Sequence, residues 1–313
     1  MIGIDYLNQI ILTFGLFLYS LIYPYITPHN HLIFIEKDPS LSYPFVPDQV
    51  THSTNLIISI AIPLIILIAI QFRHGKAFTQ VNYWLGIGLA QCLLTTLIIY
   101  STLKIIIGCP RPNFFAVCNY NHYNQTLSSG NFAFYDSLTQ FGRFGDINHC
   151  FTSPQLIDYA FQSFPSGHAG LSFASMTYSV FLLKFLFDPL SDFEWEWSST
   201  RGFISTTPLY LAGWVSLTRL QDYKHRPVDV VCGALIGVII AFITWQNSLY
   251  YAKLIKDNPW VQVLEEEDDI SQNEDDRPQT ENDYLLNNIP PNYSLPIKNP
   301  SSHHITISAF NHP

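Results

Sequence analysis

Six stretches of this sequence are apolar over about the length that a helix needs to cross a bilayer. A transmembrane helix needs about 20 consecutive, mostly apolar residues. The six stretches are Tyr6–Ile26, Asn55–Phe72, Tyr83–Leu103, Ala169–Phe187, Phe203–Thr218 and Val230–Ala252. Only the fourth contains a charged residue, Lys184, which lies near its end, where a long side chain can reach the interface. The pattern predicts an all-α, polytopic membrane protein with six transmembrane helices.

The composition also favours lipid over water as the solvent of this chain. Charged residues make up 12% of the 313 residues, against about 25% in soluble domains. A soluble bundle with buried core helices is the alternative, but such helices rarely reach about 20 residues without charge on a wet face. Residues 265–283 carry ten acids and one base, and their net charge of −9 equals that of the whole chain. The rest is neutral, so no basic face for a nucleic acid is expected.

Two parts of the chain differ in character. Residues 1–252 are predicted to form a six-span membrane domain, whereas residues 253–313 form an acidic tail that lacks apolar periodicity and is predicted to be disordered. An even number of spans places both termini on one side of the membrane. The loop His29–Thr54, the long loop at 104–168 and the short connection at 219–229 then share the other side.

Three blocks of polar residues fall on that second side. They are Lys104-Ile-Ile-Ile-Gly-Cys-Pro-Arg111-Pro112, then Pro165-Ser166-Gly167-His168, then Thr218-Arg219 with His225 and Asp229. Each block alone reads as an ordinary helix end or turn. Because the topology sends all three to one face of the membrane, their cations, histidines and carboxylate are expected to converge.

The cations of these blocks suit an anion with several oxygen atoms. Lys104, Arg111 and Arg219 supply fixed positive charge, and the planar fork of arginine matches the geometry of phosphate. Ser166 and Gly167 stand where the fourth helix begins, and unpaired N–H groups at a helix start can point at a phosphate. The sequence therefore predicts a phosphate-binding site.

The two histidines add nucleophilic and acid–base chemistry to that site. His225 and Asp229 lie four residues apart at a helix start, which brings their side chains together. The carboxylate can hold one ring nitrogen protonated and leave the other free to attack, and His168 remains as a general acid. A metal site is the alternative for these groups. It is disfavoured because the nearby cations repel a divalent ion and one carboxylate is few for magnesium or calcium.

The three blocks resemble the signature motifs of the type 2 phosphatidic acid phosphatase superfamily, which follow the pattern Lys-x6-Arg-Pro, Pro-Ser-Gly-His and Ser-Arg-x5-His-x3-Asp. Their order and spacing are similar to those of the lipid phosphate phosphatase branch, and look closest to fungal diacylglycerol pyrophosphate/phosphatidate phosphatases. The resemblance covers roughly residues 1–250 in layout. Two positions depart from it: Thr218 replaces the usual serine, and Cys109-Pro110 stands where many relatives have a further basic residue.

The resemblance implies an integral membrane enzyme that hydrolyses phosphomonoester or pyrophosphate lipids, such as phosphatidate, diacylglycerol pyrophosphate or lysophosphatidate. It implies that His225 attacks phosphorus and becomes a phosphohistidine, that Asp229 supports it, and that His168 protonates the leaving oxygen. The residues that it assigns to phosphate binding are Lys104, Arg111, Ser166, Gly167 and Arg219. It implies no metal or other cofactor, with activity independent of Mg²⁺, and a membrane lipid in the bilayer as the partner.

Three other functions are weighed beside this one. A lipid phosphotransferase could use the same motifs to pass the phosphoryl or head group to an alcohol. A non-catalytic binder or transporter of lipid phosphates needs the cations but not the two histidines and the carboxylate. A vanadate-dependent haloperoxidase shares the motif geometry, but six membrane spans disfavour it. The motifs rank neither the lipid phosphates nor the vacuole, Golgi, endoplasmic reticulum and plasma membrane as locations, and they leave the oligomeric state open.

The resemblance also implies an orientation, because family members place the catalytic face on the lumenal or extracellular side, with the termini in the cytosol. Asn124 begins a glycosylation sequon in the long loop. Cys118 and Cys150 lie in the same loop and could form a disulfide in an oxidising compartment. The alternative is that both cysteines are free and the sequon is unused. A second sequon, at Asn292 in the tail, is predicted to stay unmodified.

Overall fold

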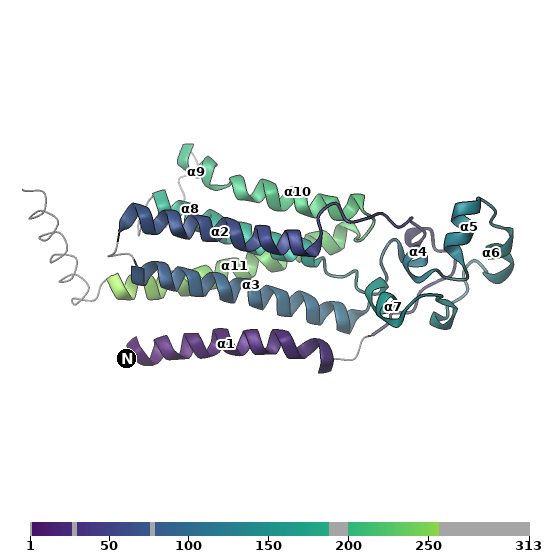
Figure 1. The fold of residues 1–313 in the computed structure, drawn as a ribbon, viewed down its shortest axis with the longest axis horizontal. Coiled ribbons are helices and arrows are strands. Elements are labelled where there is room, and N and C mark those ends of the chain that lie inside the picture. Colours follow the sequence, from purple (N-terminus) through teal and green to yellow (C-terminus); the bar gives the residue numbers. More distant parts are fainter. Residues whose placement is uncertain (1, 27–29, 76–78, 188–199, 257–313) are drawn as a thin grey trace, which may run out of the picture. The chain divides into compact units, whose positions relative to one another are not determined.

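The computed structural model describes residues 2–26, 30–75, 79–187 and 200–256, so nearly all of the predicted disordered tail lies outside the described residues. Within these ranges the chain is helical, with two isolated β-bridges (Figure 1). The long helices are α1 (Ile2–Ile26), α2 (His52–His74), α3 (Thr79–Ile107), α8 (Gly167–Phe187), α10 (Thr207–Gln221) and α11 (Pro227–Lys256). The shorter ones are η1 (Pro39–Leu41), α4 (Phe114–Cys118), α5 (Tyr123–Ser129), α6 (Ala133–Leu138), η3 (Ile147–His149), α7 (Pro154–Ala160) and α9 (Thr200–Ser205).

Four helices are long and apolar enough to cross a membrane, namely α2, α3, α8 and α11. Each corresponds to one of the predicted stretches, and together they make the protein an integral membrane protein. Helix α1 is apolar over Leu7–Ile22, and α10 has 15 residues. The all-helical architecture of the described residues is therefore confirmed, with four candidate membrane spans, whereas spanning by α1 and α10, and with it the count of six, stays a prediction.

The stretch Phe203–Thr218, predicted as one span, is divided between two helices in the structure. Helix α9 ends at Ser205 and α10 begins at Thr207, with Pro208 in the first turn of α10. Proline has no N–H and its ring crowds the preceding turn, so it fits the start of a helix and disfavours its interior. The break therefore falls just before Pro208.

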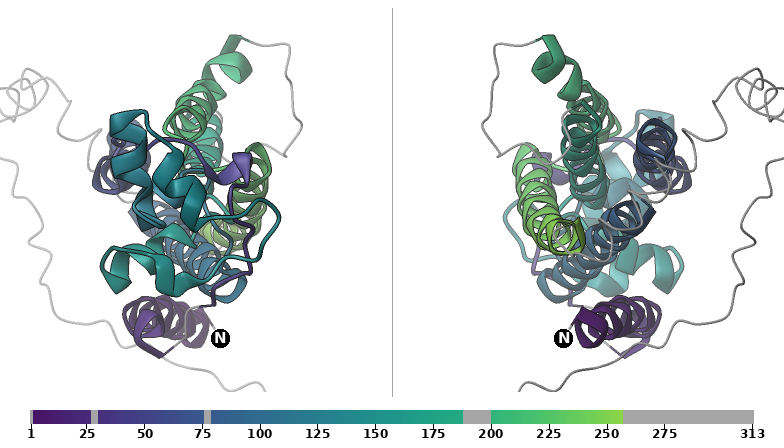
Figure 2. Two further views of the ribbon diagram at one scale, coloured as in Figure 1. Left: turned by 90° about the vertical axis from the view of Figure 1, so that its right-hand side faces the viewer. Right: turned by 90° about the vertical axis from the view of Figure 1, so that its left-hand side faces the viewer.

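Helix α8 packs against α2, α3, α10 and α11. Glycines bring the backbones of α8 and α11 together: a Cβ added at Gly237 would collide with the carbonyl oxygen of Gly170, and one added at Gly233 with that of Ser166. Small residues of this kind allow close helix packing in membranes. Helix α1 lies at the edge of the bundle (Figure 2), along α3. There Gln91 donates hydrogen bonds to the side chains of Gln9 (2.9 Å) and Thr13 (3.0 Å).

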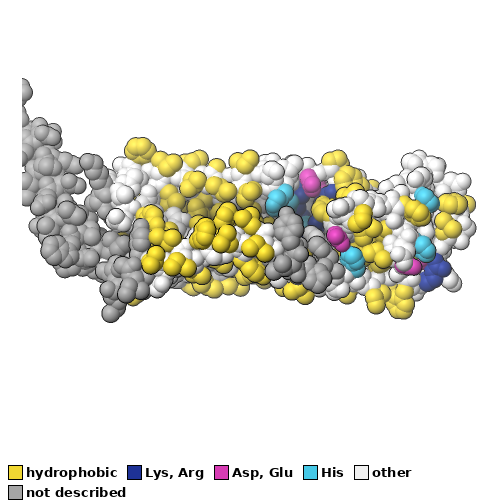
Figure 3. Space-filling view, turned by 60° about the horizontal axis from the view of Figure 1, so that its bottom comes forward, with side chains coloured by type: hydrophobic (Ala, Val, Ile, Leu, Met, Phe, Trp, Pro, Cys, Tyr) yellow, Lys and Arg dark blue, Asp and Glu magenta, His cyan; other side chains and the backbone are white. Residues whose placement is uncertain are grey.

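The predicted long loop at 104–168 is a folded unit at one end of the bundle (Figure 1). Together with the segment that follows α1 it forms what we call the cap, residues 30–42 and 108–162. Its own hydrophobic core includes Phe34, Phe114, Phe115, Tyr120 and Phe161. On the face drawn in Figure 3, hydrophobic side chains run along the bundle, while the charged and histidine side chains gather over the cap and its junction with the bundle. The cap also exposes large hydrophobic side chains, among them Ile33, Phe141 and Phe144, so on this face it differs from the bundle in its charged and histidine side chains.

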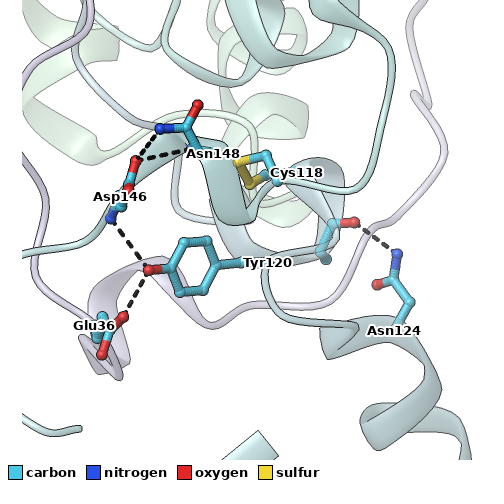
Figure 4. The surroundings of a disulfide bond; sticks show 8 residues. Glu36, Cys118, Tyr120, Asn124, Asp146 and Asn148 are labelled. Carbon is cyan, nitrogen blue, oxygen red and sulfur yellow. Dashed lines mark hydrogen bonds between the residues drawn. A yellow bond between two sulfur atoms is a disulfide. The ribbon is translucent and has the colours of Figure 1, made fainter. Parts of the chain in front are cut away.

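A buried carboxylate joins two distant segments of the cap (Figure 4). Glu36 Oε1 accepts hydrogen bonds from the hydroxyl of Tyr120 (2.6 Å) and from Arg143 Nη2 (2.8 Å). Its Oε2 accepts from Arg143 Nε and from the backbone N–H of Gln140, both at 2.8 Å. Burial by itself raises the pKa of Glu36, but these hydrogen bonds outweigh it and hold the pKa below its ordinary value. The carboxylate therefore stays ionised and fully paired.

Candidate active site

A cavity of about 460 Å³ lies at the junction of the bundle and the cap. Six of the residues singled out in the sequence line it: Lys104, Arg111, Gly167, His168, Arg219 and His225. They come from the end of α3, the cap, the start of α8, the end of α10 and the turn before α11. Blocks that are far apart in the chain thus meet around one space. Ser166 and Asp229 are buried beside it and do not line it.

Lys104 and Arg111 are buried cations that are held by neutral groups. Lys104 Nζ donates to the carbonyl of Gln162 at 2.6 Å. Arg111 Nε donates to the carbonyl of Tyr159 at 2.9 Å, and its guanidinium lies 3.9 Å from the centre of the Tyr159 ring. Burial lowers the pKa of Arg111, although an arginine remains charged in proteins. Within the described ranges neither cation pairs with a carboxylate, so their charge is left for an anion in the cavity.

Arg219 is held differently, because carboxylates contact it on two sides. Its Nη2 donates to Asp222 at 2.7 Å, and its Nη1 donates to Asp48 at 2.8 Å. Nε and Nη2 also donate to the hydroxyl of Thr218, at 3.1 and 3.0 Å. Thr218 therefore positions the guanidinium through the hydroxyl group that it shares with the serine of the family motif.

His225 and Asp229 approach each other as their spacing suggests, but they do not form a direct hydrogen bond. Nδ1 of His225 lies 3.8 Å from Oδ2 of Asp229, which is too far for one. That oxygen instead accepts from the hydroxyl of Ser163 (2.6 Å) and from the N–H of Arg226 (2.8 Å). Burial lowers the pKa of His225 well below its ordinary value, and the positive charges of Lys104 and Arg111 lower it further, against the opposite effect of Asp229. The imidazole is thus neutral near pH 7, as a nucleophile requires.

The second block forms the wall around the start of α8. Ser166 donates its backbone N–H to the carbonyl of Asp229 at 2.9 Å, which ties this block to the third. A Cβ at Gly167 would lie 2.7 Å from the ring of Tyr100, so the glycine is needed for packing as well as for an open cavity. His168 Nε2 is buried and has no hydrogen-bond partner among the described residues. Its ring lies edge-on to that of His52, with centroids 5.8 Å apart.

Sequence reasoning missed four residues that shape this site: Ser163, Asp48, His52 and Tyr159. Ser163 stands two residues before the second block, so its hydroxyl beside that block was a usable signal. Asp48 and His52 lie in and after a proline-containing segment with no local pattern, and only the fold brings them to the cavity. No cluster of three or more His, Cys, Asp or Glu side chains suited to a metal ion occurs in the described part of the chain.

The cap carries the other residues singled out in the sequence (Figure 4). Cys118 and Cys150 form a disulfide in the structure, whereas Cys92, Cys109 and Cys232 are free. Asn124 is exposed in α5, and its side-chain amide donates to the carbonyl of Ala116 at 2.8 Å. Both features lie on the part of the protein that covers the cavity.

Comparison with known proteins gives the chain a family. Residues 85–253, which contain all three blocks, match the model of the PAP2 superfamily. The chain is 30% identical over 216 residues to the probable diacylglycerol pyrophosphate phosphatase 1 of Schizosaccharomyces pombe, covering 67% of this chain and 70% of the relative. It is 26% identical to lipid phosphate phosphatase 1 of Arabidopsis thaliana (75% and 65% covered) and 26% identical to phospholipid phosphatase 2 of Homo sapiens (74% and 77% covered). No solved structure matches it significantly.

Proposed function

The chain belongs to the PAP2 superfamily, and on that premise we propose that it is an integral membrane lipid phosphate phosphatase. One observation carries the proposal: buried cations that have no carboxylate partner among the described residues share a single cavity with two histidines, His168 and His225. Buried charges are costly unless they are compensated, so this arrangement suits an anionic ligand. A phosphate group has the charge and the several oxygen atoms that Lys104, Arg111 and Arg219 can bind.

The proposed reaction has two displacement steps at phosphorus. Nδ1 of His225 faces Asp229, so Nε2 attacks; a P–N bond forms as the P–O bond to the lipid breaks. Protonated His168 gives its proton to the departing lipid oxygen. A water molecule then passes a proton back to His168 and attacks the phosphohistidine, which releases inorganic phosphate and restores neutral His225. The cations stabilise the phosphoryl oxygens in both steps without a metal ion.

The walls of the cavity support a lipid as the carrier of that phosphate. Beside the cations, the cavity is lined by Ser20 of α1 and by Leu97, Tyr100 and Ser101 of α3. Helix α3 is a candidate membrane span, so these residues support a position of the cavity next to the bilayer. A head group at the junction with the cap can then reach His225 while its acyl chains stay in the membrane. Phosphatidate, diacylglycerol pyrophosphate and lysophosphatidate are the proposed substrates.

Phosphate release from a panel of these lipids by detergent-purified protein tests the function. We expect release that persists in EDTA, is inhibited by vanadate and is lost in the variant His225→Ala. Adding a lipid alcohol as acceptor distinguishes the alternative: a phosphotransferase would pass the phosphoryl group to that alcohol. Strict dependence on added Mg²⁺, or transfer without release, would contradict the proposal.

Rapid quenching tests the covalent intermediate. After incubation with lipid labelled in its phosphate, wild-type protein should carry label that is stable in base and lost in acid, as expected for a phosphoramidate. His168→Ala should still become labelled but should release the label slowly, because the water that attacks the phosphohistidine lacks its base. His225→Ala should take up no label. If the His225→Ala variant became labelled, a residue other than His225 would be the nucleophile.

We further propose that the cap and the cavity face the lumen or the exterior, with both termini in the cytosol. The disulfide and the exposed sequon, both in the cap, support this orientation. Asn124→Gln should remove a glycan and Asn292→Gln should remove none, as judged by electrophoretic mobility after glycosidase treatment. A glycan on Asn292 would invert the orientation.

A further inference from the structure

The side of Arg219 that faces the cavity is already occupied by a carboxylate. Arg219 is 1% exposed, and residues of its own helix end, Thr218 and Asp222, hold Nε and Nη2. The partner of Nη1 is Asp48, at 2.8 Å. Asp48 lines the cavity, whereas Asp222 is fully buried and does not. A phosphate that approaches Arg219 from the cavity therefore meets Asp48 at the same nitrogen.

Asp48 is placed there by a firmly attached backbone. The backbone N–H of Gln49 donates to Asp222 Oδ2 at 3.0 Å. The side-chain amide of Gln49 donates to Asp222 Oδ1 at 2.8 Å and to Gln221 Oε1 at 3.1 Å. Val50 is buried, and the side chain of Thr51 caps α2. Because these contacts hold residues 49–51 in place, the backbone itself keeps Asp48 beside Arg219.

The preceding residues of this segment are fixed as well. We call residues 43–51 the strap. The ring of Tyr43 stacks on that of Tyr223, with centroids 4.7 Å apart, and the backbone N–H of Tyr43 donates to the carbonyl of Pro112. The ammonium group of Lys224 lies 4.1 Å from the centre of the Phe45 ring. The strap thus packs along the turn that leads to His225 and carries Asp48 at its cavity side.

We propose that Asp48 is a specificity-determining residue that competes with phosphate for Arg219 and weakens the binding of free phosphate. The inference rests on the proposed function, in which phosphate is bound in this cavity. A phosphate group carries about −1.5 to −2 charges near pH 7, so it competes with a carboxylate for one N–H and is repelled by it. A lipid substrate also gains binding energy from its acyl chains, which offsets this repulsion. The inorganic phosphate left after hydrolysis has no such contribution, so Asp48 favours its release.

The variant Asp48→Asn tests this, because it keeps an oxygen acceptor for Arg219 and removes the charge. We measure the competitive inhibition constant of inorganic phosphate against lipid phosphate hydrolysis by detergent-purified full-length protein. The constant should fall about tenfold, which corresponds to about 1.4 kcal/mol. Asp48→Ala should lower it in the same direction. The matched control is Asp136→Asn, which removes the same charge on α6, where Asp136 pairs with Lys37 away from the cavity lining; it should leave the constant unchanged.

The outcomes separate the two proposals. An unchanged or raised constant in Asp48→Asn and Asp48→Ala overturns the role of Asp48. A loss of kcat with weaker phosphate inhibition would mean that Asp48 only positions Arg219, which also overturns the inference. If neither phosphate nor vanadate inhibits the wild-type enzyme competitively, the phosphate-binding cavity itself is wrong, whatever the variants show.

Discussion

Two carboxylate–arginine clusters among the described residues, one around Glu36 in the cap and one around Arg219 at the cavity, differ in which charged groups lack a partner of opposite charge. In the cap, both oxygens of Glu36 accept two hydrogen bonds each, and Arg143 is their main donor. At the cavity, Arg219 is also paired with carboxylates, but Lys104 and Arg111 nearby are held only by carbonyl groups and an aromatic ring. In the first cluster the charges of Glu36 and Arg143 neutralise each other, and the contact stabilises the fold of the cap. The second carries surplus positive charge, which suits an anionic ligand.

Hydrogen bonding shows the same difference. Nδ1 of His225 and Nε2 of His168 are buried without a hydrogen-bond partner among the described residues. A buried polar atom without a partner costs about 1–3 kcal/mol. Both oxygens of Glu36 in the cap have hydrogen-bond partners, so this cost does not arise there. At the cavity it arises at the two histidines that are proposed to take part in the reaction with phosphate. The five predictions that follow use this contrast: changes at the cavity should affect turnover, and changes at Glu36 in the cap should affect stability.

The largest expected effect is on turnover in His225→Ala. Loss of a nucleophile should lower kcat by about 10⁴-fold or more, because no other described side chain is placed to attack. The melting temperature should stay close to that of the wild type, since the imidazole has an unpaired nitrogen. The control is His149→Ala, at an exposed position of the cap. If His225→Ala kept more than about a hundredth of the wild-type rate, the assignment of the nucleophile would be wrong.

Glu36→Gln should have the opposite profile. Removing the carboxylate leaves the hydrogen-bond donors of Arg143 and Tyr120 poorly paired, at a cost of about 2–3 kcal/mol. Thermal unfolding in detergent should occur about 5–10 °C lower, with kcat unchanged at temperatures where the protein is folded. Lys37→Gln, which breaks an exposed ion pair of the same cap, is the control.

The pH dependence of stability tests the same carboxylate. The pKa of Glu36 is lower in the folded state than in the unfolded state, so its stabilising contribution is present above the unfolded pKa and is lost as pH falls through the folded one. Wild-type stability should therefore fall below about pH 4.5, and Glu36→Gln should lack this part of the decline. An identical decline in both proteins would mean that Glu36 is not the group that titrates.

A smaller effect on turnover is expected in Ser163→Ala. The hydroxyl donates to the oxygen of Asp229 that faces His225, so its loss should disturb the orientation of the pair. A hydrogen bond to a charged group contributes about 1.5–3 kcal/mol, so kcat should fall roughly 10- to 100-fold with KM little changed. Ser163→Thr, which keeps a hydroxyl, should restore part of the rate, and Ser137→Ala on α6 is the control. A change in KM alone would mean that Ser163 does not position Asp229 for turnover.

The smallest expected effect is a shift in the pH profile. The profile of kcat/KM should be bell-shaped, because His225 must be neutral and His168 protonated. Burial and nearby cations lower the pKa of His225, so the acidic limb should lie below pH 6.5. Lys104→Met removes one of those positive charges, which raises the pKa of His225. The acidic limb of the remaining activity should therefore shift to higher pH by about one pH unit or less. A shift toward lower pH, or a flat profile, would contradict this.

The sequence by itself determined the helical membrane class, because long uncharged apolar stretches have few other stable arrangements. It also identified the polar side chains that gather at the cavity, because the three blocks bring lysine, arginine, histidine and aspartate at fixed spacings to helix ends. Motif spacing within one helix start placed His225 near Asp229. Those features depend on local periodicity, which can be read from the chain.

Only the tertiary structure decided how the polar partners are distributed. The contacts of Arg219 with Asp48 and of Glu36 with Arg143 join residues separated by 171 and 107 positions, and no local pattern encodes such pairs. The cap was expected as a loop because its helices are short and its core is aromatic without regular spacing. Whether a buried cation keeps its charge for a ligand or loses it to a carboxylate depends on which distant segment packs against it, and the fold alone determines that.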